Sequence, residues 1–521
     1  MFNKVLIANR GEIALRIIRA CREMGVRSVA VFSDADAASP HVREADEAVN
    51  VGPAPSTESY LLGDRIVEVA LDRGAEAIHP GYGFLSEREW FARSVRAAGL
   101  SFVGPPAEAI AAMGSKTAAR TLAVASGVPV VPGTTEALRD ADAACRIASQ
   151  FGYPVLLKAA AGGGGKGMRV VTEESGMEAA LESARREAKN AFGDDAVYVE
   201  KYIDGPRHVE IQVLADMHGN VLSLGERECS VQRRHQKMLE EAPSVAVSAD
   251  LRREMGETAV RMARAAGYVN AGTCEFLLDR DGKFYFLEMN TRLQVEHPVT
   301  ELVTGIDLVQ WQLRIAAGEI LPFAQADLTP RGWAIECRIT SEDTANGFLP
   351  STGRIDYLHV PGGPGVRWDS GIETGSVVGL NYDPMLAKLI VWAETRELAI
   401  ERMHRALLEL TIDGVETSRD FHLRLMEDEE FRRGDIDIQW LERRLPQMTG
   451  ALPPARSVRS AAIAAALFAE RDRGGGPLPD GRAMADPSAA RGESPAGHVG
   501  SDGHLANNDG WMRAGRLEGL R

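Results

Sequence analysis

The chain has 521 residues and a formal net charge of −15, with 45% hydrophobic and 26% charged residues. This length is too great for one compact domain and suggests about three, and the composition is that of an ordinary globular protein. The acidic balance disfavours non-specific binding to nucleic acid or to an anionic membrane, because such binding needs lysine and arginine to neutralise phosphates.

The five cysteines include no CxxC pair. Neither a disulfide framework nor a structural zinc site is therefore expected, and reduced thiols favour the cytoplasm. Near the N-terminus, Arg10 and Glu12 come too early for the apolar core of a signal peptide. No run of about 18 apolar residues predicts a membrane span.

Strands alternate with helices over residues 1–113, which predicts a doubly wound parallel sheet. Ligands of such sheets bind at the carboxyl ends of the strands, so the turn at 9–11 and the loop at 80–85 are candidate ligand-binding segments. The expected strands are 4–9, 29–32, 77–79 and 101–103, and the expected helices are 12–24 and 66–71.

The pattern changes over residues 114–330. Strands 154–158 and 169–172 are joined by the glycine-rich stretch 161–168, which predicts a hairpin. A helix is expected over 178–191. Strands at 197–201, 208–214 and 221–226 read as an antiparallel sheet of a different kind from the first.

Residues 331–446 predict a third, α+β block, and the composition shifts after it. The expected elements of this block are strands 334–339, 353–358 and 389–393 and helix 396–409. In the remaining segment, 447–521, residues 457–473 suggest one more helix. Residues 474–509 are nearly free of large apolar side chains and are expected to be disordered.

The glycine-rich stretch is the first candidate for chemistry, because small residues let backbone N–H groups approach phosphate oxygens. It is not a Walker A loop, since Gly167 rather than Ser or Thr follows Lys166, and it does not open a helix. Lys158 on the preceding strand and Lys116 need an anion if they face a cleft. Nucleotide phosphates would supply one.

Two apolar strands, 273–278 and 284–290, each carry one carboxylate, Glu275 and Glu288. Asn290 follows two residues after Glu288 and so projects from the same face. Two carboxylates and an amide oxygen are hard ligands that suit Mg²⁺ or Mn²⁺ carrying nucleotide phosphates.

Arg292, Gln294 and Glu296 alternate as on one face of an extended segment. Arginine suits a planar anion such as bicarbonate, and the neighbouring glutamate suits a general base. A surface salt bridge between Arg292 and Glu296 is the plain alternative. The basic run 232–237 is flanked by glutamates, which favours a small anion over nucleic acid.

Across residues 2 to about 445 the chain resembles the biotin carboxylase family, the catalytic component of biotin-dependent carboxylases. The combination of EMNTRLQVEHPVTE with RRHQK is specific to this family, whereas other ATP-grasp ligases share only the glycine loop and the paired acids. Further matching strings are KVLIANRGEIALRIIRACRE, HPGYGFLSE, MGSK, GGGGKGMRVV, EKYIDGPRHVEIQVL, AIECRI and YDPMLAKLI.

The resemblance implies an N-terminal domain (1–113), an ATP-grasp domain (114–330, lid about 131–204), a C-terminal biotin carboxylase domain (331–446) and a tail (447–521). It implies bicarbonate at Lys237, Arg292, Gln294 and Val295, Glu296 as the base and Arg338 at biotin. Metal ligands would be Glu275, Glu288 and Asn290. ATP contacts would be Lys116, Lys158, Gly164, Gly165, Glu200, Lys201, Ile203, His208 and His235.

The implied activity is ATP-dependent carboxylation of biotin, the first half-reaction of an acetyl- or propionyl-type acyl-CoA carboxylase, as in fatty acid biosynthesis. A homodimer and a carboxyltransferase partner are also implied. No Met-Lys-Met string occurs, so the biotinyl carrier is expected on a separate chain or to have been lost by truncation. Arg88 and Lys166 depart from the family pattern, where Asn and Arg are usual.

The residues leave two alternative functions open. Another ATP-grasp ligase, joining a carboxylate to an amine, would keep the glycine loop, lysines and acids but has no use for Arg338. A nucleotide-binding regulatory protein without catalysis would be indicated by loss of Glu288, Asn290 or Glu296, and all three are present.

Overall fold

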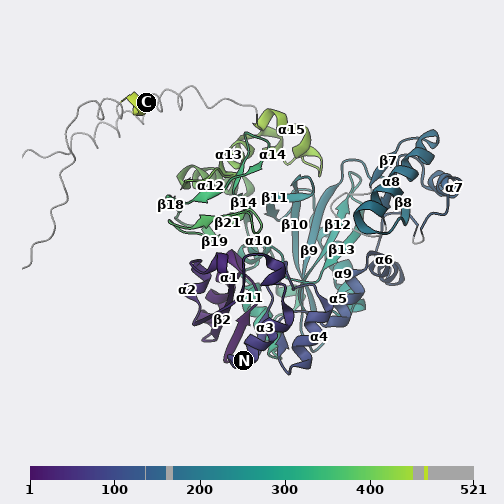
Figure 1. Ribbon diagram of the computed structural model, residues 1–521. Helices are drawn as coiled ribbons and strands as arrows, with labels where there is room; N and C mark the ends of the chain where they lie inside the picture. Colours follow the sequence, from purple (N-terminus) through teal and green to yellow (C-terminus); the bar gives the residue numbers. More distant parts are fainter. Residues whose placement is uncertain (135–136, 160–167, 450–462, 467–521) are drawn as a thin grey trace, which may run out of the picture. The chain divides into compact units, whose positions relative to one another are not determined.

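The computed structural model describes residues 1–134, 137–159, 168–449 and 463–466. The chain divides into two units, Met1–Ala451 and Leu452–Arg521, and the elements below all belong to the first (Figure 1). The helix expected at 457–473 and the tail 474–509 lie outside the described residues, apart from 463–466, which are helical. No helix in the described ranges is long and apolar enough to cross a membrane.

The N-terminal block is the expected parallel sheet, with strand order β3-β2-β1-β4-β5. Strand β3 was not expected, because its residues alternate between half-buried and exposed at the sheet edge. The strands are β1 (Lys4–Ile7), β2 (Arg27–Ser33), β3 (Glu47–Gly52), β4 (Ala77–His79) and β5 (Ser101–Phe102). The helices are α1 (Gly11–Glu23), α2 (Pro40–Glu44), α3 (Gly63–Asp72), α4 (Glu89–Ala97) and α5 (Ala107–Gly114).

The carboxyl ends of β1 and β4 are tied together by one buried side chain. Asn9 Nδ2 donates to the carbonyls of Pro80 and Tyr82, each at 2.7 Å. Gly81 has φ +63°, and a Cβ there would lie 2.9 Å from Asn9 Nδ2, so only glycine lets the loop pass this close. The two segments predicted to lie at these strand ends therefore form one connected surface.

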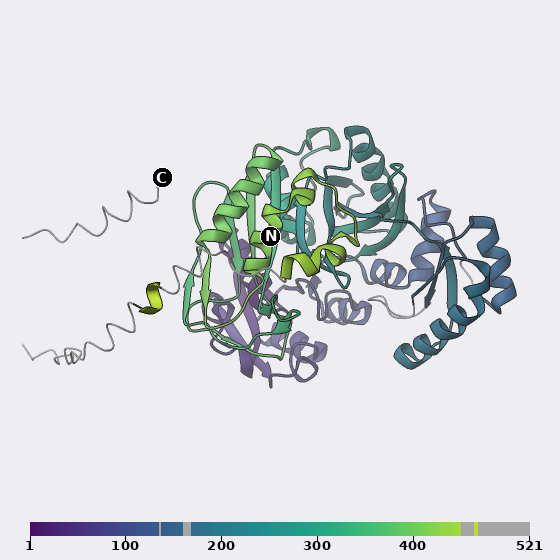
Figure 2. The same cartoon turned by 90° about the horizontal axis from the view of Figure 1, so that it is seen from above.

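A small antiparallel sheet, ordered β7-β6-β8, follows in the chain and carries two helices (Figures 1 and 2). Its strands β6 (Val155–Ala159) and β7 (Arg169–Val171) pair as the expected hairpin. The glycine-rich loop between them, with Gly164 and Gly165, lies outside the described residues. The other elements are β8 (Val197–Lys201), α7 (Ala141–Phe151) and α8 (Met177–Phe192).

The largest sheet has eight strands, all antiparallel, in the order β13-β12-β9-β10-β11-β14-β21-β19. It runs without a break across residue 330. Its strands are β9 (Arg207–Ala215), β10 (Val221–Arg233), β11 (Gln236–Ala242), β12 (Asn270–Leu278), β13 (Phe284–Asn290), β14 (Trp333–Thr340), β19 (Val366–Ser370) and β21 (Met385–Ala393).

The basic run 232–237 forms the tip of the β10–β11 hairpin. Arg234 and His235 have φ of 49° and 64°, as a two-residue turn between twisted strands requires. The chain here lacks the Asn-Gly pair that normally signals such a turn, so the expected strand at 221–226 was too short and β11 was not expected. The turn places Lys237 on β11, two residues after His235 and opposite Gln232.

Helices cover both the middle and the last strands of the large sheet. Met403, Leu407, Phe421 and Trp440 form part of the apolar core beneath its C-terminal strands. The helices are α6 (Lys116–Ala125), α9 (Ala249–Ala265), α10 (His297–Thr304), α11 (Leu308–Ala316), α12 (Arg396–Glu409), α13 (Arg419–Glu427), α14 (Glu429–Arg433) and α15 (Trp440–Thr449).

The prediction of a single strand at 353–358 is wrong. It divides into β17 (Gly353–Arg354), which pairs with β20 (Val377–Val378), and β18 (Tyr357–His359), which pairs with β22 (Thr411–Asp413). The division occurs because Ile355 N donates to Ser376 O and Asp356 N donates to Asp413 O, which lie on different partners. The remaining short strands are β15 (Glu342–Asp343) and β16 (Leu349–Pro350).

Candidate active site

A cleft of about 830 Å³ is bounded by the large sheet, the small β6–β8 sheet, α6 and the start of α15. All of the described residues that were predicted to bind ATP, metal, bicarbonate or biotin line it, whereas the candidate ligand-binding segments 9–11 and 80–85 do not. Those that line it are Lys116, Lys158, Glu200, Lys201, Ile203, His208, His235, Lys237, Glu275, Glu288, Asn290, Arg292, Gln294, Val295, Glu296 and Arg338.

The two acids expected to bind metal stand directly opposite each other on β12 and β13. Glu275 accepts hydrogen bonds from Asn290 Nδ2 at 2.7 Å and Gln294 Nε2 at 3.0 Å. Glu288 makes no hydrogen bond or ion pair with a described residue, and burial and then Glu275 raise its pKa. A half-buried carboxylate without a hydrogen-bond partner, opposite a second carboxylate, fits a divalent cation with oxygen ligands.

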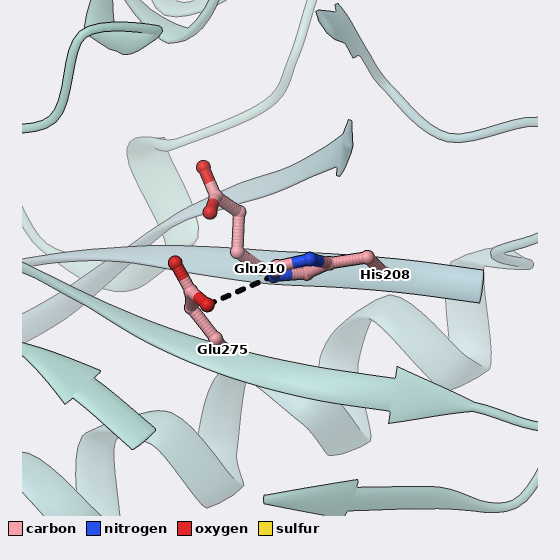
Figure 3. A group of neighbouring side chains, drawn as sticks. All are labelled: His208, Glu210 and Glu275. Atoms are coloured by element: carbon pink, nitrogen blue, oxygen red, sulfur yellow. Dashed lines mark ion pairs between the residues drawn. The ribbon is translucent and has the colours of Figure 1, made fainter. Parts of the chain in front are cut away.

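A second group, His208, Glu210 and Glu275, has its ligand atoms close enough for a metal ion (Figure 3). Glu210, however, is already paired with Arg227 at 2.5 Å and with Lys237 at 2.6 Å. His208 Nε2 lies 3.0 Å from Glu275. Burial lowers the pKa of His208, but the neighbouring carboxylates Glu275 and Glu210 raise it, and the net shift is upward. Because Glu210 is already held by two cations and His208 by Glu275, this group suits a metal less well than the Glu275–Glu288 pair.

Lys237 links the acids at the centre of the cleft. Its Nζ lies 2.6 Å from Glu296, 2.6 Å from Glu210 and 3.1 Å from Glu275. Burial alone would raise the pKa of Glu296, but Lys237 and then Arg338 hold it well below its usual range. Glu296 is therefore a buried carboxylate that stays ionised at neutral pH, as a general base must.

The two arginines of the site are each oriented by an acid that sequence reasoning did not select. Arg292 Nε donates to Glu87 at 2.9 Å, and Glu87 also accepts from Thr291 N at 3.0 Å. Arg338 Nε donates to Glu240 at 2.7 Å. Glu87 lies between β4 and α4, 205 residues from Arg292, and Glu240 lies in a strand that was not expected, so the spacing of residues in the sequence indicated neither contact.

The part of the cleft lined by α6 and the small sheet holds the two lysines predicted to contact nucleotide phosphates. Lys158 Nζ pairs with Glu200 at 2.6 Å, and Arg120 pairs with the other oxygen of Glu200 at 3.0 Å. Lys116, the first residue of α6, makes no hydrogen bond or ion pair with a described residue. Lys201 instead donates to the carbonyl of Gly152 at 2.8 Å. Lys116 is thus the cation most open to a phosphate.

The segment 291–296 is not a strand. It ends in a turn in which His297 N donates to Gln294 O, and α10 begins at His297 with Pro298 in its first turn. The turn still directs Arg292, Gln294 and Glu296 into the cleft, as their alternation predicted.

Comparison with known families and proteins decides the affiliation. Residues 1–110 match the biotin carboxylase N-terminal domain, 115–324 the carbamoyl-phosphate synthase L chain ATP-binding domain and 336–443 the biotin carboxylase C-terminal domain. The chain is 52% identical to a biotin carboxylase of Haemophilus influenzae over 85% of its own length and 99% of that protein. The chain belongs to the biotin carboxylase family.

Other relatives agree with this affiliation. A biotin carboxylase of Bacillus subtilis is 51% identical over 85% of this chain and 98% of that one. A biotin carboxylase from Campylobacter jejuni, solved as a β-γ-ATP complex, has 47% identity and a TM-score of 0.81 over 85% of this chain and 99% of that one.

A solved biotin carboxylase domain dimer, from the 2-oxoglutarate carboxylase of Hydrogenobacter thermophilus, contains MgADP, ADP and bicarbonate. It is 47% identical with a TM-score of 0.81, over 87% of this chain and all of that one. The expected biotin carboxylase architecture and the ATP-dependent carboxylation of biotin are thereby confirmed, and so are ATP, Mg²⁺, bicarbonate and biotin as the reactants and cofactor. The roles of individual residues stay predictions.

Proposed function

We propose that this biotin carboxylase family member forms carboxybiotin in the 830 Å³ cleft, with Glu296 as its general base. The observation that carries the proposal is the state of Glu296. Its carboxylate is 2% exposed, yet Lys237 at 2.6 Å and Arg338 at 3.0 Å keep it ionised. A base of this kind stands ready to remove a proton from a bicarbonate bound beside Lys237 and Arg292.

The first step joins bicarbonate to the γ-phosphate of ATP. Glu296 takes the bicarbonate proton, and the resulting oxygen nucleophile attacks phosphorus with release of ADP. Lys116 and Lys158 lie at the nucleotide end of the cleft and balance the charge on the transferring phosphoryl group. Glu275, Glu288 and Asn290 would hold Mg²⁺, which neutralises phosphate charge when bound.

The second step carboxylates biotin. Carboxyphosphate breaks into CO₂ and phosphate, phosphate takes the N1′ proton, and N1′ attacks CO₂. Arg338 points its guanidinium into the cleft and stabilises the negative charge that develops on the ureido oxygen. Glu200, Lys201, Ile203, His208 and His235 complete the proposed ATP site, with Gly164 and Gly165 in the loop outside the described residues.

The finer assignments are also part of the proposal. We divide the chain at 1–113, 114–330, 331–446 and 447–521, with the lid at about 131–204. We place it in a homodimer, as in the solved domain dimer, acting with a biotinyl carrier and a carboxyltransferase of an acetyl- or propionyl-CoA carboxylase. The five cysteines are free thiols, which suits the cytoplasm.

Phosphate release from MgATP by the purified chain tests the reaction. The rate is expected to depend on bicarbonate and to rise with free biotin. A rate that ignores both additions would contradict the biotin reaction and favour another carboxylate–amine ligation.

Two variants test the residue roles. Glu296→Gln and Arg338→Gln should each lower biotin-dependent turnover by about 10²-fold or more, the scale of a lost base or oxyanion donor. Arg207→Gln is the matched control, because it removes an arginine from an ion pair with Glu228 outside this cleft. Near-normal turnover in both site variants would overturn the roles of Glu296 and Arg338.

A further inference from the structure

Arg338 is shared between two buried carboxylates. On one side, Glu240 Oε1 accepts from Arg338 Nε at 2.7 Å and lies 2.5 Å from Nη2. On the other side, Nη2 donates to Glu296 Oε2 at 3.0 Å. Glu240 therefore makes the closer and more numerous contacts, and it is the principal anchor of the guanidinium.

This anchoring leaves one edge of the guanidinium for a substrate. Arg338 Nη1 makes no hydrogen bond or ion pair with any residue in the described ranges. The side chain lines the cleft and is 18% exposed. Because a guanidinium is planar and rigid, fixing its Nε–Nη2 edge also fixes the direction of the two N–H groups on Nη1.

Glu240 has no other evident task. It is fully buried and does not line the cleft, so it does not touch substrate. Its Oε2 has no hydrogen-bond partner. Glu336 stands opposite it on β14, and neither of its carboxylate oxygens has a hydrogen-bond partner among the described residues, so this neighbour does not hold Glu240 in place. A buried carboxylate oxygen left without a partner costs stability, which a purely structural role would not explain.

We infer that Glu240 is the positioning residue of Arg338: by holding the Nε–Nη2 edge it aims Nη1 at the biotin ureido oxygen and stops the guanidinium from closing fully onto the base Glu296. The inference rests on the proposed function, because it concerns the substrate of the same cleft. Without Glu240, Arg338 would form a two-point pair with Glu296, the geometry that arginine and carboxylate prefer. That pair would withdraw both the ureido donor and the base.

The neighbouring residue on β11 supplies a matched control. Glu241 points to the other face of the strand and is also fully buried. Both of its oxygens are satisfied, by Arg396 Nε at 2.7 Å, Arg396 Nη2 at 3.1 Å and Trp333 Nε1 at 2.7 Å. Glu241 thus holds the fold together, whereas Glu240 holds a side chain of the cleft.

The test compares Glu240→Leu, Glu240→Gln and Glu241→Gln in the full chain, with free biotin, bicarbonate and MgATP as substrates. Glu240→Leu should lower kcat/KM for biotin by about 10²-fold, the effect of displacing a reacting group by about 1 Å. The KM for ATP should stay within about twofold, because no phosphate contact changes. Glu240→Gln keeps the acceptor oxygen but not its charge and should lose about tenfold.

Glu241→Gln should lower the melting temperature with little change in either kinetic constant. The inference is overturned if Glu240→Leu keeps the wild-type kcat/KM for biotin, or if its KM for ATP rises in parallel with its KM for biotin. If the leucine variant does not fold, an unchanged kcat/KM for biotin in Glu240→Gln overturns it equally. Absence of biotin-dependent turnover in the wild-type chain would instead refute the proposed function itself.

Discussion

Single ionisable groups decide most of the chemistry of this cleft, because each is buried and each changes the charge of its neighbours. Lys237 contacts three carboxylates at once, and these raise its pKa well above its usual range. Glu275 and Glu296 in turn have their pKa held well below the usual range against the effect of burial. Such a cluster is stable only as a whole, since removing one partner leaves an uncompensated buried charge.

Glu240 makes the effect of burial measurable as a pH dependence of stability. Burial, with Glu296 nearby, raises its pKa from 4.5 to about 7 although Arg338 lowers it. As the pH rises, the unfolded chain releases this proton near pH 4.5 but the folded protein only near pH 7. The folded state therefore loses stability through that window, by about 2 kcal/mol between pH 5.5 and 7.5.

The predicted quantity is the difference in unfolding free energy between the wild type and Glu240→Leu. Measured by denaturant unfolding, this difference should favour the wild type by about 2 kcal/mol more at pH 5.5 than at pH 7.5. Equal pH dependences for the wild type and Glu240→Leu would mean that Glu240 does not titrate in this range.

At this scale the sequence predicted the groups proposed to carry chemistry, which the structure brings into one cleft, but not the acids that contact its arginines. Glu275 and Glu288 could be found because each interrupts an apolar strand, and the structure places the two directly opposite each other. Glu87 and Glu240 could not be found, because their partners Arg292 and Arg338 lie 205 and 98 residues away. The period-two alternation of a strand describes only that strand. It carries no information about a contact between residues so far apart in the sequence.

At the scale of elements, the turn that carries Val295 and Glu296 is fixed by a lysine from a distant strand. Lys388 on β21 is fully buried, and its Nζ donates to the carbonyl of Val295 at 2.8 Å and pairs with Glu12 of α1 at 3.2 Å. Strand β21, helix α1 and the turn before α10 therefore meet at one ammonium group. This contact fixes the backbone of Glu296, while Lys237 and Arg338 fix its carboxylate.

Removing that ammonium should destabilise the fold and the site together. Lys388→Met leaves Glu12 as a buried carboxylate without its counter-ion, which is expected to cost about 3–5 kcal/mol of unfolding free energy. In the double variant Lys388→Met/Glu12→Gln most of this loss should return, because no unpaired charge remains. Turnover should stay low in both variants, since the Val295 carbonyl has lost its donor.

Denaturant unfolding combined with phosphate release separates these effects. If the double variant is no more stable than Lys388→Met, the prediction is contradicted, because Glu12 is then not the residue left unpaired. Glu12→Gln alone is the control, because Lys388 can still donate to Val295 O in that variant. It should keep more turnover than either variant that lacks Lys388.

The elements that sequence reasoning missed have local explanations. Strand β3 alternates at a sheet edge and buries only Val51, so it lacks the apolar run of its neighbours. Strand β11 follows a turn made by Arg234 and His235 in the left-handed region, where Asn and Gly are usual. Strand β12 was predicted because burial on both faces leaves a nearly continuous hydrophobic string, and the edge strand β13 because its sequence is apolar up to Glu288.

At the scale of the whole molecule, the cleft is a product of chain segments that are far apart in sequence. It is lined by residues from Lys116 to Glu442, and the sheet beneath it joins β11 to β14 across residue 330. The pattern of expected elements placed a change of block at this point, but it could not indicate that one sheet continues through it. Hydrogen bonding between β11 and β14 makes the middle and last blocks mutually dependent.

All of the described residues that line this cleft belong to the unit Met1–Ala451. A chain ended after Ala451 should therefore keep bicarbonate-dependent phosphate release, and its biotin stimulation, within about twofold of the full chain, because no proposed contact to substrate is removed. Its melting temperature should also be retained, since the apolar core beneath α12, α13 and α15 ends at Met448.

A shorter chain ended after Asp435 is the control. It removes Trp440 from that core and Ile438 from the cleft, and should lose both stability and turnover. Loss of turnover in the longer truncation, with its melting temperature unchanged, would show that residues 452–521 contribute to the reaction itself.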